Sequence, residues 1–276
     1  MTYHQALERE TYLKKTMEEN PDYAGILPLF VAICEHIREN PGAGGISFAL
    51  PADAEDRVRG GSPAVTGEEL VVDAAAAVSF LQGLADRMMA LGIGESAQFK
   101  NFRYLTEREV PTLLQAWFQG QRGVLQSAAF RLRINPGVLE TLLAVPVKEA
   151  AAEAAANVPE EWYAGWDGLT CPVCASEPAM AELQEDESKH LSCGVCRTQW
   201  HFRRTACPLC GNEDTEKLSH FMVEGDFIRV EVCGRCHRYL KTRDSRLGGR
   251  EVPLDLLDVT TMHLDILAER HGFSRT

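Results

Sequence analysis

The sequence predicts an α+β protein: an all-α N-terminal helical domain, two small zinc-ribbon modules, and a C-terminal helix. Apolar residues recur at three- and four-residue intervals through most of residues 1–158. Eight of the nine cysteines then form C-x-x-C pairs. Around them, short alternating stretches and glycine-containing turns replace the helical pattern. We place the domains at 1–160 (helical), 161–205 (first module) and 206–276 (second module with the C-terminal helix).

Start and stop signals divide the N-terminal domain into helices. Asn20-Pro21 separates the first two, and its proline suits the first turn of the second. Thr66 and Glu69 have capping-box spacing for a helix that ends at Gly92. The aromatic pair Trp117 and Phe118 is assigned to the core. The predicted helical segments are 4–20, 22–40, 67–92, 102–121, 123–134 and 135–158.

Residues 41–66 are rich in Gly, Pro and Ala and show no sustained helical period, which predicts a long loop. Beyond residue 158, two short runs on either side of Gly225-Asp226 predict a β-hairpin. The chain closes with a helical pattern in which Leu264, Leu267 and His271 are suitably spaced. We expect this last helix to stop at Gly272 and to pack on the rest of the protein.

Composition and charge limit the function classes. No apolar run has the length of a membrane helix and the N-terminus is charged, so we predict a cytoplasmic protein without membrane insertion. The net charge is −12, and residues 1–170 hold 14 Lys+Arg against 23 Asp+Glu. Such a surface fits a phosphate backbone poorly, which disfavours nucleic acid. Neither a phosphate-binding loop nor a dinucleotide fingerprint occurs.

The paired cysteines predict metal binding, because disulfides seldom persist in a reducing cytosol. The ninth cysteine, Cys34, is interpreted as a small buried apolar residue. The candidate metal ligands are Cys171, Cys174, Cys193, Cys196, Cys207, Cys210, Cys233 and Cys236.

The spacing of the pairs favours two sequential sites. Gaps of 18 and 22 residues suit a hairpin between two C-x-x-C turns, whereas the central gap is 10 residues. The first two pairs then form one site and the last two the other, joined by a strand through Trp200, which we expect to cover the junction. The alternative, in which the central pairs share one ion, is disfavoured.

Four thiolates leave no open ligand position, so such sites favour a role in folding over catalysis, and no catalytic residue is nominated. Zinc and iron both suit a tetrahedral four-sulfur site. Cys207-Pro208-Leu209-Cys210-Gly211 has the C-P-x-C-G form of a rubredoxin knuckle, whereas the first pair continues with Ala175.

Other polar residues near the cysteines receive weaker assignments. His190, His201, His220 and His237 are interpreted as solvated histidines or as neighbours of the ligands. A basic run, Arg235 to Arg250, comprises six cations with Asp244 among them. Such a run is usually a solvated face, and we also consider it as a docking patch for an acidic partner.

The chain resembles the formate dehydrogenase accessory protein (FdhE) family. The resemblance is carried by CPVCASEP, LSCGVCRTQWHFRRTACPLCGN, CGRCHRYLK and DVTTMHLDILAERHGFSR, within residues 160–276. It implies a helical domain and two rubredoxin-like modules whose eight cysteines usually bind iron, two ions per chain, with zinc as the alternative. Ala175 stands where the family commonly has Gly.

The resemblance also implies a cytoplasmic maturation factor or chaperone that contacts the catalytic subunit of a formate dehydrogenase and is not itself an enzyme. Our first hypothesis is therefore an accessory protein whose helical domain, ribbons and basic run bind the client while the metals shape that surface. The second hypothesis is a rubredoxin-like electron carrier. The third, a zinc-ribbon protein that binds nucleic acid, is disfavoured by charge.

Overall fold

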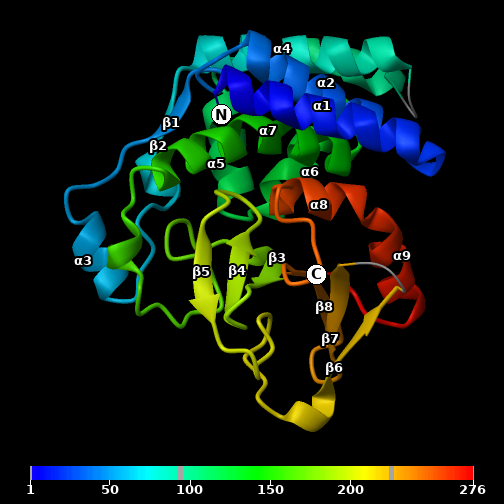
Figure 1. The fold of residues 1–276 in the computed structure, drawn as a ribbon. Coiled ribbons are helices and arrows are strands. Elements are labelled where there is room, and N and C mark those ends of the chain that lie inside the picture. Colours follow the sequence, from blue (N-terminus) through cyan, green and yellow to red (C-terminus); the bar gives the residue numbers. More distant parts are fainter. Residues whose placement is uncertain (1, 93–95, 224–226, 276) are drawn as a thin grey trace. The chain divides into compact units, whose positions relative to one another are not determined.

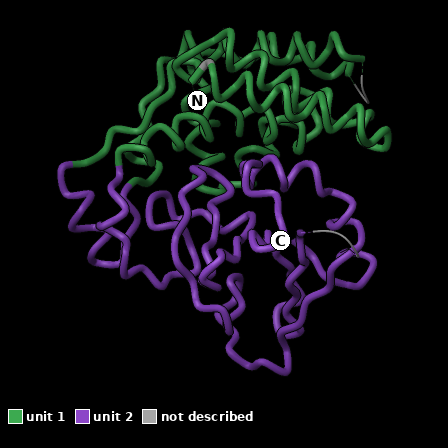
Figure 2. The backbone as a smooth tube through the Cα atoms, viewed as in Figure 1, with its two compact units in different colours: residues 1–51, 65–157 green, residues 52–64, 158–276 purple. Residues whose placement is uncertain are grey.

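The computed structural model describes residues 2–92, 96–223 and 227–275. The chain forms two compact units (Figure 2): unit 1 comprises residues 1–51 and 65–157, and unit 2 comprises residues 52–64 and 158–276. Both groups of cysteines lie in unit 2. The predicted division of the cysteine-rich part near residue 205 stays a prediction.

Unit 1 is helical, as predicted (Figure 1). Its core includes fully buried leucines such as Leu13, Leu81 and Leu114. Phe118 packs on Phe48, with ring centroids 4.7 Å apart. The helices are α1 (Tyr3–Glu19), α2 (Leu27–Glu39), α4 (Ala74–Leu91), α5 (Val110–Phe118), α6 (Arg122–Leu132) and α7 (Pro136–Ala155), with 3-10 turns at Pro21–Tyr23, Gly67–Glu69 and Ser96–Tyr104.

The capping box was predicted correctly but attached to the wrong element. Thr66 and Glu69 cap the short 3-10 turn, where the Glu69 carboxylate accepts from the Thr66 backbone N–H at 2.7 Å. Strand β2 (Leu70–Val72) follows, and helix α4 begins only after Asp73, whose carboxylate accepts from the Ala76 N–H. The successive β-branched residues Val71 and Val72 favour the strand. The predicted end is correct, because Gly92 has a positive φ of 65°.

The segment 41–66 is not a featureless loop. Strand β1 (Ile46–Phe48) pairs antiparallel with β2, and helix α3 (Ala54–Arg59) follows. Residues 52–64 belong to unit 2, where the Ala64 N–H donates to the Pro172 carbonyl at 3.0 Å. Pairing with a distant strand has no local helical signature, so the sequence pattern did not reveal it.

Two other predicted helices were too long. The second begins at Leu27, because residues Pro21–Tyr23 form a separate 3-10 turn. The segment 102–121 contains a helix only from Val110, next to Pro111. In both cases the observed helix has a proline in its first turn, where the missing N–H costs no hydrogen bond.

Unit 2 is built on one six-stranded sheet with the order β5-β4-β3-β8-β7-β6. Neighbouring strands are antiparallel except for β3 and β8, which pair in parallel. The strands are β3 (Pro178–Leu183), β4 (Lys189–Cys193), β5 (Gln199–Phe202), β6 (Leu218–Met222), β7 (Ile228–Cys233) and β8 (Arg238–Asp244). The predicted β6–β7 hairpin is present, and its turn at residues 224–226 lies outside the described residues.

The sheet contains an internal repeat. Each half has a C-x-x-C turn, a hairpin, a second C-x-x-C turn and a third strand, in that order along the chain. Strand β3 of the first half pairs with β8 of the second, with Met180 opposite Lys241 and Leu183 opposite Asp244. This pairing joins the two predicted modules into one continuous sheet.

The basic run is only partly a solvated face, because Arg235, Arg246 and Arg250 are exposed whereas Lys241 and Arg243 are buried. Half of its six cations lie on β8, an inner strand, where Lys241 is 1% and Arg243 is 5% exposed. Five of its cations are paired within unit 2: Arg238 with Glu177, Lys241 with Asp258 and Asp265, Arg243 with Glu182, Arg246 with Asp244, and Arg250 with Glu185. The hydrogen bond from Arg246 lowers the pKa of Asp244 to about 2.

The C-terminal segment forms two helices where one was predicted. These are α8 (Leu254–Thr260) and α9 (Met262–Arg270), which meet at Thr261. Lys241 Nζ donates to the Asp265 carboxylate and to the Asp258 carbonyl, at 2.8 and 2.7 Å, so both helices are tied to β8. Gly272, with a φ of 84°, follows the end of α9. Among the described residues, no helix is both long and apolar enough to span a membrane.

Candidate metal centres

The eight paired cysteines form two clusters in unit 2, in the sequential arrangement that the spacing favours. The first contains Cys171, Cys174, Cys193 and Cys196, and the second contains Cys207, Cys210, Cys233 and Cys236. In each cluster one C-x-x-C turn precedes the first strand of a hairpin and the other lies at the end of its second strand. The two hairpins are β3–β4 and β6–β7. The hairpin therefore determines which pairs meet.

The sulfur atoms are spaced as a tetrahedral ion requires. Metal–sulfur bonds of about 2.3 Å give a tetrahedron with sulfur–sulfur edges of about 3.8 Å. In the second cluster, the Sγ atoms of Cys207 and Cys236 are 3.9 Å apart and those of Cys210 and Cys233 are 3.8 Å apart. The first cluster is slightly tighter, with contacts of 3.4–3.5 Å. Both could hold a zinc or an iron ion.

All four turns share a backbone feature that the sequence pattern only partly revealed. The residue after the second cysteine has a positive φ: Ala175 59°, Arg197 64°, Gly211 71° and His237 55°. This conformation brings the N–H of Ala175, Gly211 and His237 to the carbonyl of the first cysteine, at 2.9 Å in each case. Ala175, which stands where the family commonly has Gly, therefore has a strained backbone conformation.

Polar groups surround the sulfur atoms. Backbone N–H groups of Val173, Val195 and Leu209 point at the first sulfur of their turn, at 3.3–3.4 Å. The first cluster also has two hydroxyl neighbours, Ser176 at 3.4 Å from Cys174 Sγ and Thr198 at 3.0 Å from Cys196 Sγ. Such donors stabilise thiolate charge, which a bound cation requires.

The two clusters differ in exposure. All four cysteines of the first are buried, whereas Cys210 and Cys236 of the second are half-buried. Burial raises the pKa of the Cys171 and Cys207 thiols. Hydrogen bonds from the Cys171, Cys193 and Cys196 thiols lower the pKa of Cys174. A cation would favour the thiolate form throughout.

None of the four histidines predicted near the cysteines belongs to a cluster of the described residues. His190 and His201 are register partners on β4 and β5, with ring centroids 5.8 Å apart. Burial lowers the pKa of His190. His237 stacks on Phe273, and His220 lines the pocket described below.

Trp200 and Cys34 are both buried. The Trp200 indole donates to the Gly168 carbonyl at 3.1 Å, in the segment that leads into the first cluster. Trp200 is therefore tied to the segment before Cys171, and its expected place over the junction of the two modules stays a prediction. Cys34 lies in α2 of unit 1 and belongs to neither cluster.

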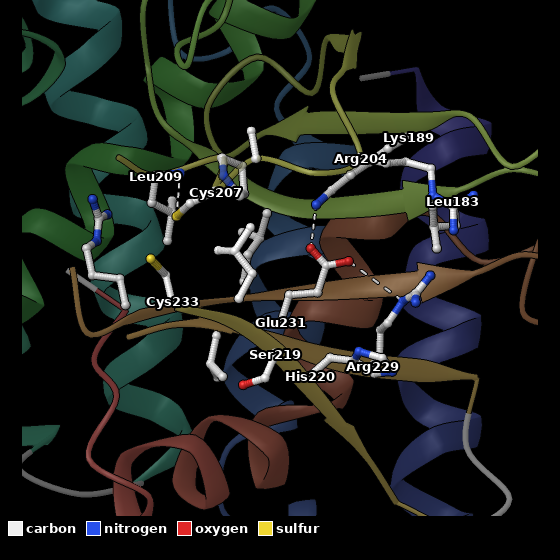
Figure 3. A pocket seen from close by; sticks show the side chains of 16 residues that line it. Leu183, Lys189, Arg204, Cys207, Leu209, Ser219, His220, Arg229, Glu231 and Cys233 are labelled. Atoms are coloured by element: carbon white, nitrogen blue, oxygen red, sulfur yellow. Dashed lines mark hydrogen bonds and ion pairs between the residues drawn. The ribbon is translucent and has the colours of Figure 1, made fainter. Parts of the chain in front are cut away.

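A pocket of about 250 Å³ opens beside the second cluster, with Cys207 and Cys233 in its lining (Figure 3). Glu231 lies at its centre and forms ion pairs with Lys189 and Arg229. Apolar residues such as Leu183 and Leu240 complete the lining. Two ligand residues of the second cluster thus face a cavity.

Comparison with known proteins agrees with this architecture. The model of the FdhE central domain matches residues 170–204, which hold all four cysteines of the first cluster and strands β3, β4 and β5. An FdhE homologue of Aquifex aeolicus is 36% identical over 119 residues, 41% of this chain and 40% of the relative. An FdhE homologue of Erwinia tasmaniensis is 32% identical over 128 residues, which are 45% of this chain and 41% of the relative.

The chain spans about two fifths of the length of these curated relatives. The crystal structure of the FdhE protein from Pseudomonas aeruginosa has the same fold, with a TM-score of 0.71 and 19% identity. That match covers all of this chain and 94% of the other. The central-domain match, the related sequences and the shared fold confirm the predicted resemblance of this chain to the FdhE family.

Proposed function

We propose that this protein is an accessory factor that binds the catalytic subunit of a formate dehydrogenase and is needed for that enzyme's activity. In this proposal the eight cysteines bind two metal ions, one per cluster. The protein acts in the cytoplasm, as the sequence predicts, and is not itself an enzyme. The observation that carries the proposal is the pair of four-sulfur clusters within an FdhE-type fold.

The chemistry of the clusters supports a binding role. Four sulfurs fill a tetrahedral coordination sphere, so substrate would have no free ligand position at either ion. The binding energy of each ion would instead act as folding energy for its hairpin and two turns. We propose iron as the native metal, as the family resemblance implies, and zinc as the alternative with the same coordination.

The structure changes our hypothesis for client recognition. The basic run was a candidate docking patch, but five of its cations are engaged by carboxylates within unit 2. Breaking those pairs to bind a client would cost their stabilisation. We therefore assign recognition to other surfaces of the two units.

Deletion and complementation test the proposal. We expect a strain that lacks this protein to lose formate dehydrogenase activity, and the wild-type protein to restore it. The Cys174→Ser and Cys210→Ser variants should restore less activity, whereas Cys34→Ser should match the wild type. The tagged protein should also co-purify with the catalytic subunit. Full activity in the deletion strain, or no association with that subunit, would refute the accessory role.

A rubredoxin-like electron carrier is the second candidate, because Cys210 and Cys236 of the second cluster are half-buried. Solvent access to ligand sulfurs allows a redox partner to approach. A reversible one-electron titration of the iron-loaded protein, with loss of the wave in Cys210→Ser, would favour this candidate. A redox-inactive native metal would exclude it.

A further inference from the structure

A second cleft in unit 2 lies outside both metal clusters. Its volume is about 520 Å³. One wall is the end of α3 and the turn after it, Val58 to Gly61, and the other is the segment 161–168 that leads to the first cluster. Gly61 has a φ of 83°, and a Cβ placed there would meet nothing within 4 Å, so this wall faces open space.

Three aromatic side chains line the cleft: Trp162, Tyr163 and Trp166, all half-buried. Trp166 is held in place because its indole donates to the Thr170 carbonyl at 2.9 Å and its ring lies against Gly168. Burial raises the pKa of Tyr163, which keeps its phenol protonated. The Trp162 indole N–H and the Tyr163 hydroxyl have no hydrogen-bond partner among residues 2–92, 96–223 and 227–275. Two donors are thus available to a ligand.

The charge around the cleft is negative. Glu161 and Asp167 line it and are exposed, and Glu160 acts electrostatically on Tyr163. The one cation of the lining, Arg59, is engaged by Glu55 on its own helix at 2.8 Å. Aromatic faces bordered by carboxylates attract cations, because the ring faces are negative and the carboxylates add charge.

We propose that this aromatic cleft binds an arginine or lysine side chain of a partner polypeptide. The cation stacks between the aromatic rings and pairs with Glu161 or Asp167. Trp162 and Tyr163 donate to the carbonyls of the flanking backbone, which a free metal ion or a small amine could not use. Arginine suits the cleft better than lysine, because its planar guanidinium stacks on rings and is more weakly hydrated. This inference does not depend on the accessory role, since it concerns peptide binding by the purified chain.

Tryptophan fluorescence tests the proposal on the full metal-loaded protein. The probe is a capped pentapeptide with one central arginine, and its matched control carries citrulline, which has the same shape without the charge. Two of the four tryptophans lie in the cleft. We expect a saturable change with the arginine peptide and affinity about tenfold weaker with the citrulline peptide.

Variants locate the binding site. The double variant Glu161→Gln/Asp167→Asn removes the two lining carboxylates, and both residues are exposed, so the fold should be retained. We expect it to weaken binding about tenfold. The matched control Glu18→Gln/Glu107→Gln removes the same charge at exposed positions in unit 1 and should leave affinity unchanged.

Three results would overturn the proposal. The first is the absence of a saturable fluorescence change. The second is equal affinity for the citrulline peptide, which would show that the charge is not recognised. The third is equal weakening by both double variants, which would show attraction to the acidic chain as a whole.

Discussion

At the scale of single residues, the four C-x-x-C turns differ in which residue follows the second cysteine. All four have positive φ, but only Gly211 is a glycine. An L-residue in this conformation is strained by about 1–2 kcal/mol, because its Cβ crowds the following carbonyl. Ala175, Arg197 and His237 therefore carry strain that Gly211 lacks, and the surrounding turn must hold them in place.

Exchange of Ala and Gly at equivalent positions tests this strain. Ala175→Gly should stabilise the metal-loaded protein by about 0.5–1 kcal/mol, since relief of strain exceeds the entropy cost of glycine. Gly211→Ala should destabilise it by about 1 kcal/mol, because its Cβ would make only an ordinary contact at 3.7 Å from Leu169, leaving the backbone effect. Chemical denaturation measures both. If the two substitutions changed the free energy of unfolding in the same direction, the strain assigned to Ala175 would be contradicted.

His36 is expected to make unit 1 sensitive to acid. It is 5% exposed, and its Nε2 lies 3.0 Å from the Phe80 carbonyl. Burial lowers its pKa below that of the unfolded chain, so the unfolded state binds the proton more readily. Its contribution to stability is therefore present above pH 6.5, the unfolded value, and is lost as pH falls through and below it.

The wild type should lose stability between pH 7.5 and 5.5, with a contribution from His36 of at most about 1.4 kcal/mol per pH unit. His36→Gln should show a shallower slope, and His4→Gln, at an exposed position, should keep the wild-type slope. Denaturant midpoints across this range give the comparison. Parallel slopes for wild type and His36→Gln would mean that His36 does not titrate on unfolding.

At the scale of elements, β8 connects the parts of unit 2. It pairs in parallel with β3 and antiparallel with β7, so it joins the two cysteine-bearing hairpins. Two of its cations form ion pairs with other elements. Arg243 pairs with Glu182 on β3, and Lys241 pairs with Asp258 on α8 and Asp265 on α9. The buried cations of the basic run, Lys241 and Arg243, therefore stabilise the fold.

Removal of one buried cation tests this role. Lys241→Met should destabilise the protein by about 3 kcal/mol, because Asp258 and Asp265 would each lose one cationic partner and keep Arg275. Arg203→Gln, which breaks an exposed pair with Glu213, should cost about 0–1 kcal/mol. Urea unfolding distinguishes them. Similar losses in the two variants would show that the β8 pairs behave as surface pairs.

At the scale of the whole molecule, two similar clusters in one unit have different surroundings. The first is closed by four buried cysteines, and the second has two half-buried cysteines and a pocket against Cys207 and Cys233. Each cluster is completed by its own hairpin. The clusters should therefore bind metal independently and release it at different rates.

Elemental analysis tests independence. We expect about two ions per chain in the wild type and one in each of Cys174→Ser and Cys210→Ser, because four sulfurs complete a tetrahedral site. Cys34→Ser should retain both, since Cys34 lies in unit 1. Loss of both ions from one substitution would show that the clusters fold together.

Release kinetics test the difference in exposure. With a chelator in excess, the wild type should release metal in two phases, the faster from the second cluster. Cys174→Ser should keep the fast phase and Cys210→Ser the slow one. The reverse assignment would show that exposure of the ligands does not control release.

The sequence by itself determined the helical first half, the eight clustered cysteines and their sequential arrangement, because these depend on periodicity and on spacing within one hairpin. It also predicted the C-terminal ends of helices α4 and α9 near Gly92 and Gly272, because a helix end depends on the local backbone conformation. One of its failures has a non-local cause. The start of α4 at Ala74 depends on β2 pairing with β1, about 24 residues away in register.

Only the tertiary structure decided the remaining features. The β3–β8 pairing unites residues about 60 apart and turns two modules into one sheet. It also places Arg243 of the basic run in the interior of the fold, where the carboxylate of Glu182 comes from the distant strand β3. The aromatic cleft arises in the same way, from residues 58–61 and 161–168. Such contacts have no local signature, since their stability comes from partners far along the chain.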